Sequence, residues 1–102
     1  MALRMMIPDA ALVGRPVILA LRVTGATPDA RVTLIVELDR GQGQRAPLSQ
    51  SEVLAQPDGG ADATVSVTPP FTDDAEGLIV ATARAEDGAF LGVATGLLRV
   101  MA

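Results

Sequence analysis

Short segments of alternating apolar and polar residues, separated by turn residues, run through most of the chain. Between residues 17 and 24, every odd-numbered position is valine or leucine, whereas the even-numbered positions include Arg22 and Thr24. Residues 31–39 alternate in the same way. A period of two is typical of a half-buried strand, because successive side chains of a strand point to opposite faces. Both segments are therefore predicted to be strands.

The second half of the chain shows the same organisation. Alternation over residues 62–68 follows the turn sequence Pro57-Asp58-Gly59-Gly60 and ends at Pro69-Pro70, since proline cannot donate to a strand ladder. A strand over residues 78–86 is predicted after Gly77, and Asp87-Gly88 indicates a hairpin to a last strand over residues 89–100. Within that last strand, Gly92 and Gly96 indicate a bulge or close packing.

Two segments in the middle of the chain are less regular. Residues 40–47 contain Gly41 and Gly43 and are predicted to form a flexible loop. Residues 48–56 allow two interpretations. Ser49 and Glu52 have the spacing of a helix capping box, which favours a helical turn, whereas Val53 and Ala55 fit one face of a strand before the Pro57 turn.

The pattern predicts an all-β fold, a single immunoglobulin-like antiparallel β-sandwich of about seven strands spanning residues 1–102. Residues 1–13 are expected to form an edge strand or N-terminal arm that breaks at Pro8. The apolar positions predicted to fill the core between the two sheets are Val17, Leu19, Leu21, Val32, Leu34, Val36, Val65, Val67, Ile79 and Leu98.

Three segments of the second half, residues 60–69, 77–83 and 86–89, together resemble bacterial immunoglobulin-like and fibronectin type III-like domains. Those families carry a comparable run of alternating residues and an acidic-glycine turn across their last two strands. Two departures stand out: Ile79 occupies the place where these families often have a corner tyrosine, and the disulfide and core tryptophan of antibody-type domains are missing. The resemblance implies a scaffold and no particular ligand.

The composition removes most side chains used in catalysis and metal binding. The 102 residues include no His, Cys, Trp or Tyr, and all eight basic residues are arginine. Ser49, Ser51 and Ser66 therefore lack a His or Lys that could act as a base for nucleophilic catalysis. We expect a protein that is not an enzyme, with no cofactor and no metal. The scattered arginines and the net charge of −4 also argue against nucleic-acid binding.

Acidic residues gather in the predicted turns. The sandwich layout would bring Asp29, Asp58, Glu86 and Asp87 to one end, where carboxylate oxygens on loops could bind Ca²⁺. The other interpretation is that these residues serve turn geometry and solubility, because no calcium-loop spacing is present. A second acidic group, residues 73–76, is expected at the opposite end near Arg15, Arg40 and Arg45, as solvated charges.

Some predicted strands carry apolar residues on both faces. If Ile79, Ala81 and Ala83 face the core, Leu78 and Val80 must face outward. A sheet that is apolar on both sides is normally covered by another structure. The residues predicted to form such a protein interface are Ile35, Leu78, Val80, Leu91, Val93 and Leu97.

These observations predict a structural or assembly module that contacts other protein subunits, or further copies of itself, within a larger complex. An accessory subunit of a phage-like particle is one possible setting, and a module that binds carbohydrate or Ca²⁺ is the alternative. No signal peptide or apolar run of membrane-spanning length is recognised, so we expect a cytoplasmic location or a place in an assembled particle, without membrane insertion.

Overall fold

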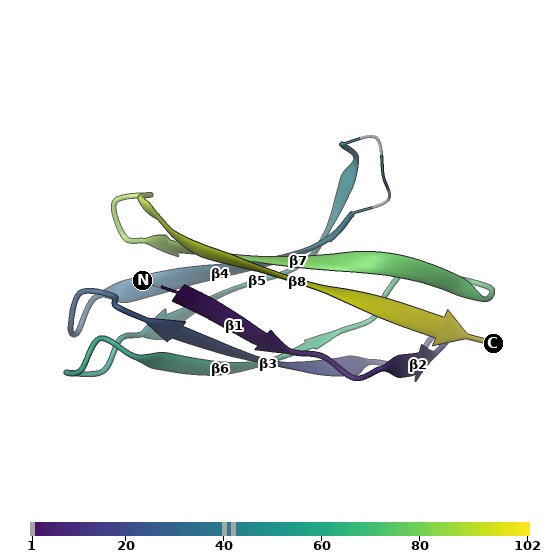
Figure 1. Cartoon of the computed structure of the whole chain (residues 1–102), viewed down its shortest axis with the longest axis horizontal. Helices are drawn as coiled ribbons and strands as arrows, with labels where there is room; N and C mark the ends of the chain where they lie inside the picture. The colour runs from purple at the N-terminus through teal and green to yellow at the C-terminus, as the bar shows by residue number, and fades with distance from the viewer. Residues whose placement is uncertain (1, 40, 42) are drawn as a thin grey trace.

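A computed structural model describes residues 2–39, 41 and 43–102, in which all regular structure is β-strand (Figure 1). The strands are β1 (Ala2–Met6), β2 (Ala10–Leu12), β3 (Val17–Thr24), β4 (Arg31–Asp39), β5 (Arg45–Leu54), β6 (Ala61–Val67), β7 (Ala75–Ala85) and β8 (Phe90–Met101). The prediction of an all-β fold is therefore confirmed.

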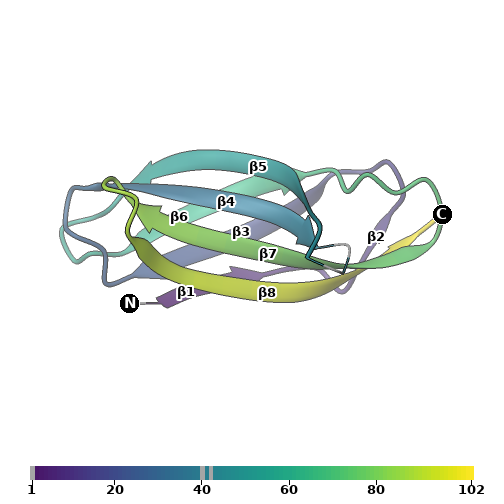
Figure 2. The ribbon, with the colours of Figure 1, turned by 90° about the horizontal axis from the view of Figure 1, so that it is seen from above.

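The strands form two layers, with the strand axes running along the long dimension of the molecule (Figures 1 and 2). The smaller sheet has the order β1-β3-β6, and the larger sheet has the order β2-β8-β7-β4-β5. Neighbouring strands are antiparallel except for β2, which runs parallel to β8. The predicted two-sheet sandwich is correct, with eight strands in place of about seven and one parallel pair.

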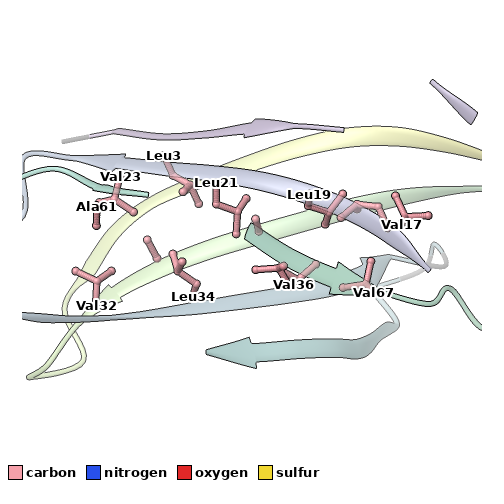
Figure 3. Close-up of a cluster of buried hydrophobic side chains, with 14 of the residues drawn as sticks. Leu3, Val17, Leu19, Leu21, Val23, Val32, Leu34, Val36, Ala61 and Val67 are labelled. Atoms are coloured by element: carbon pink, nitrogen blue, oxygen red, sulfur yellow. The ribbon is translucent and has the colours of Figure 1, made fainter. Parts of the chain in front are cut away.

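The core between the sheets consists of aliphatic side chains. Leu21 and Leu19 of β3 face Leu34 and Val36 of β4 across the space between the layers, as the close-up in Figure 3 shows. All ten residues predicted to be core are at most 7% exposed. The alternation of buried and exposed residues in β3 is unbroken over its whole length, which is the pattern that the sequence predicts.

The N-terminal segment does not form one edge strand but contributes to both sheets. β1 pairs with β3 in the smaller sheet, and the chain then crosses at Pro8 so that β2 pairs with β8 in the larger one. Two glycines of β8 allow this segment to pack closely against the strand. A Cβ atom at Gly92 would lie 3.0 Å from the backbone nitrogen of Leu3, and one at Gly96 would lie 2.9 Å from the Ile7 side chain. Close packing at both glycines, as predicted, closes this side of the sandwich.

The segment with two possible interpretations is a strand, because β5 includes residues 48–54 and pairs with β4 along its length. The helical-turn interpretation is wrong, and the predicted loop over residues 40–47 is too long, since β5 already begins at Arg45. Arg40 and Gln42 lie outside the described residues. A register shift opposite Val36 and Glu37 marks a bulge, beyond which the first part of β5 rises away from the larger sheet (Figure 1).

The predicted hairpin between β7 and β8 is confirmed. Gly88 has a φ of 87°, and its backbone N–H donates to the carbonyl of Ala85 at 2.9 Å. Glycine is suited to this position because it has no Cβ to oppose a positive φ. Within the described residues, no helix has the length and apolarity that crossing a membrane requires.

Candidate interaction surface

The outer face of the larger sheet, which points away from the smaller sheet, carries a group of exposed apolar side chains. In β7, Ile79, Ala81 and Ala83 are fully buried against the core, so Leu78 and Val80 point outward. On the neighbouring strand β8, Leu97 is paired with Leu78, and Val93 is paired with Thr82 of β7. The exposed fractions are 36% for Leu78, 51% for Val93 and 59% for Leu97.

Val80 lies in the middle of this group but is only 2% exposed. It does not belong to the core cluster, so it faces outward as predicted, although it is buried. Its paired neighbours are Glu37 on β4 and Thr95 on β8. An arginine at this position would therefore not simply meet water. Ile35, one strand further, is half-buried on the same face.

Leu91 is the one predicted interface residue that lies elsewhere. A register shift between Ala83 and Arg84 places Leu91 in a bulge of β8, from which it packs against the core. The same bulge pairs Phe90 with Arg84 on the outer face, where Phe90 is 54% exposed. Strict alternation counted back from Val93 assigns these two residues the wrong way round, because a bulge adds one residue to the count. We define the apolar outer face as Ile35, Leu78, Val80, Phe90, Val93 and Leu97.

Charged side chains border the apolar outer face. Glu76 and Arg99 are cross-strand partners whose side chains form an ion pair at 3.1 Å. Arg45 lies 3.7 Å from a carboxylate oxygen of Glu37 and 3.9 Å from one of Asp39. These charges sit at one end of the face and are at least partly exposed, so each pair contributes little to stability. Charged residues are typical of the edge of a protein interface, and these lie along one end of the face only.

A second exposed apolar group, which sequence reasoning missed, lies where the N-terminal segment crosses between the sheets. Leu12, Ile18 and Met101 are 53%, 60% and 43% exposed and line a groove of about 540 Å³. Met6, 76% exposed, borders the neighbouring part of the same surface. The residues of this second apolar group come from four strands, and the sequence pattern does not show that these strands lie side by side.

The acidic turn residues mostly serve their own turns. Asp58 accepts a hydrogen bond from the backbone N–H of Gly60 at 2.8 Å, and Asp87 accepts one from Ala89 at 2.9 Å. Asp29 has a φ of 62° and adopts the left-handed conformation that aspartate tolerates in turns. Across residues 2–39, 41 and 43–102, no three side chains of the His, Cys, Asp or Glu type are grouped as they would be around a metal ion.

The second acidic group lines a shallow hollow of about 360 Å³ beside Phe71. Asp73 caps the backbone N–H of Asp74 at 2.8 Å, and Asp74 in turn accepts from the N–H of Ala102 at 2.6 Å. Of the arginines expected nearby, Arg45 pairs with carboxylates of β4, whereas Arg40 lies outside the described residues. The carboxylates of this hollow thus accept hydrogen bonds from their own loop and from the last residue of the chain.

Comparison with known proteins supports the fold and leaves the family open. No protein-family model and no curated protein matches the chain. Among solved structures, it is similar to the CARDB domain of a Pyrococcus furiosus protein in complex with di-metal ions. The TM-score is 0.71 at 17% identity, over 98% of this chain and 91% of that one. It is also similar to superoxide reductase (neelaredoxin) from Ignicoccus hospitalis. Here the TM-score is 0.58 at 12% identity, over 98% of this chain and 80% of that one.

The second likeness contradicts the prediction that the chain is not an enzyme. A superoxide reductase is built on a fold similar to this one, so the small sandwich is no argument against catalysis. At 12% identity the likeness shows the fold alone. Any activity must therefore be argued from the side chains of this chain. The resemblance to bacterial immunoglobulin-like and fibronectin type III-like domains is confirmed only as far as the β-sandwich.

Proposed function

We propose that the protein is an interaction module that binds another protein subunit through the apolar outer face of its larger sheet. The observation that carries this proposal is that Leu78 and Leu97 are exposed cross-strand partners on β7 and β8, and that the exposed Val93 lies four residues along β8 on the same face. Exposed apolar side chains grouped on one face, with charged residues beside them, are typical of protein interaction sites.

The architecture supports a rigid contact surface. β7 lies inside the sheet and is paired with β4 on one side and β8 on the other, so the backbone beneath Leu78 and Val80 is held on both edges. Phe90 extends the surface toward the β7–β8 hairpin with an aromatic side chain. Aromatic residues are enriched at the centre of interfaces because they bury a large area with little loss of side-chain entropy.

The setting that we propose is a larger assembly, for which a phage-like particle is one example. The alternative function, binding of carbohydrate or Ca²⁺, has less support. Phe71 and Phe90 are the only aromatic residues of the chain, and they lie in different parts of the fold. The CARDB domain is in complex with di-metal ions, but that property belongs to that protein.

Val93→Arg tests the proposal, since Val93 is half exposed and an arginine there can reach water in the free protein. The tagged wild-type protein would be used to isolate a partner from its native host, and the affinity of the purified pair would then be measured by calorimetry. We expect Val93→Arg to weaken binding about 30-fold or more, which corresponds to the ~2 kcal/mol typical of a central interface residue. Circular dichroism should show an unchanged fold.

Ile18→Arg provides the matched control, because Ile18 is exposed to a similar degree on the opposite sheet. It should leave the affinity unchanged. Loss of binding in Ile18→Arg with full retention in Val93→Arg would show that the partner uses the groove near the N-terminal crossing, and the proposal would be wrong.

A further inference from the structure

The outer edge of β5 is an open edge of the larger sheet. β5 pairs with β4 on one side and is the last strand in the sheet order, whereas the other edge strand, β2, is only three residues long. The side chains of β5 that face inward, such as Ser51 and Val53, are only half-buried. The corresponding residues of β4 are completely buried. β5 therefore extends beyond the cover that the smaller sheet provides.

The hydrogen-bond pattern shows which backbone groups point out of this edge. The N–H of Ala55 donates to the carbonyl of Ala30 at 2.8 Å, which fixes the phase of the ladder between β4 and β5. In an antiparallel pair, bonded and non-bonded residue pairs alternate. The residues of β5 whose N–H and C=O groups point away from β4 are consequently Gln50, Glu52 and Leu54.

These three residues also place distinctive side chains along the edge. All three are exposed, and Leu54 is 62% exposed. Within the part of the chain that the structure describes, the Glu52 carboxylate is in no ion pair. Natural edge strands are usually protected by proline, bulges or charge. In β5 the proline and the bulge both lie in its first half, at residues 47–49, so that the stretch after them keeps only the charge of Glu52.

We propose that residues 50–54 of β5 are a strand-addition site for an extended segment of another protein, which presents a cationic side chain beside Glu52 and an apolar one beside Leu54. The added strand would complete backbone hydrogen bonds with Gln50, Glu52 and Leu54, and these bonds provide affinity independently of sequence. The negative charge of Glu52 selects the segment, because opposite charges on neighbouring strands attract and like charges repel. This site does not depend on the apolar outer face.

Amide hydrogen exchange in the isolated protein is the first test. The N–H groups of Gln50, Glu52 and Leu54 should exchange rapidly, whereas those of Ser51 and Val53 should be protected by their bonds to β4. Slow exchange at all five amides would mean that the edge is already covered within the chain, and the proposal would fail.

A short extended peptide with a lysine and a valine two positions apart serves as the probe, because side chains two positions apart lie on one face of a strand and can stand beside Glu52 and Leu54 together. Saturating peptide should slow exchange at Gln50, Glu52 and Leu54. The same peptide with glutamate in place of lysine should bind more weakly. Binding of the first peptide without any change at these three amides would place it elsewhere and overturn the proposal.

Two variants of Glu52 test the backbone N–H and the charge, because Glu52→Pro removes both whereas Glu52→Lys changes the charge alone. Glu52→Pro removes an N–H that makes no bond to β4, a position where an edge strand accepts proline, and should prevent detectable binding. Glu52→Lys keeps the N–H and should raise the dissociation constant roughly tenfold. If Glu52→Pro fails to fold, Glu52→Lys still decides the question.

Glu86→Lys is the matched control, because it makes the same change of charge in the exposed β7–β8 turn. It should have little effect on peptide binding. An equal loss in Glu86→Lys and Glu52→Lys would show a general attraction between an acidic protein and a basic peptide, which would contradict the site. Val93→Arg should also leave peptide binding unchanged, so the strand-addition site and the apolar outer face succeed or fail separately.

Discussion

At the scale of single residues, the core depends on aliphatic side chains placed at every second position. The described residues include no buried polar or charged side chain, and only the hydroxyl oxygen of Ser51 is buried without a hydrogen-bond partner. Cohesion between the two layers must therefore come from apolar burial and close packing. Surface pairs such as Arg22 with Asp62, at 2.8 Å and half exposed, contribute little beyond this.

Truncation of a central core residue should show how strongly stability depends on this packing. Leu34 is 1% exposed and lies in the middle of β4, so Leu34→Ala should lower the free energy of unfolding by ~2–5 kcal/mol. Urea denaturation followed by circular dichroism would measure the change. Ile18→Ala, at a 60% exposed position, should cost much less, and equal losses in the two variants would contradict the assignment of Leu34 to the core.

At the scale of elements, alternation predicts a strand well where the strand is regular. The predicted bounds of β3 and β4 agree with the structure, because each keeps a period of two from end to end. The wrong assignments occur where a bulge shifts the alternation of inward-facing and outward-facing residues. Bulges opposite Val36/Glu37 and opposite Ala83/Arg84 shift the phase of β5 and β8, and each bulge depends on how the strand pairs with its neighbour as well as on its own residues. A local pattern cannot contain that information.

The N-terminal segment could not be predicted from its own sequence either. Its division between two sheets depends on the space beside β8. Gly92 and Gly96 provide this space, whereas the sequence indicates only a bulge or close packing at these two positions. Leu3 and Met5 then pack inward from β1, while β2 continues on the other sheet. Since β1 is held by this contact as well as by its pairing with β3, it should be sensitive to any side chain added at Gly92.

Gly92→Val tests this dependence. The new side chain would meet the backbone nitrogen of Leu3 at 3.0 Å and its Cβ at 3.2 Å, and backbone atoms cannot move aside as easily as a flexible side-chain end. We expect a loss of ~1–3 kcal/mol in stability. The loss should be accompanied by faster amide exchange in β1. Thr95→Val, an exposed position on the same strand, is the control, and equal behaviour of the two variants would show that β1 does not rest on Gly92.

At the scale of the whole molecule, the sandwich is asymmetric, with three strands in one sheet and five in the other. The larger sheet therefore exposes both an apolar outer face and the free edge of β5. Five of the six residues predicted to form an interface lie on the outer face of this sheet, because Ile35, Leu78, Val80, Val93 and Leu97 follow the alternation of their strands. The alternation could not show that Val80 is buried, since this depends on neighbours from other strands.

We expect metal ions to have little effect on the stability of this protein, even though a structurally similar CARDB domain is in complex with di-metal ions. In this chain, the Asp58 and Asp87 carboxylates are engaged with the backbone N–H groups of their own turns. A calcium ion needs about six to eight oxygen ligands, so binding would require several such turns to rearrange together. Neither EDTA nor millimolar Ca²⁺ should shift the melting temperature measured by differential scanning calorimetry. Ligands that bind only the folded state raise this temperature, so an increase of several degrees with Ca²⁺ would reveal a site and favour the ligand-binding alternative.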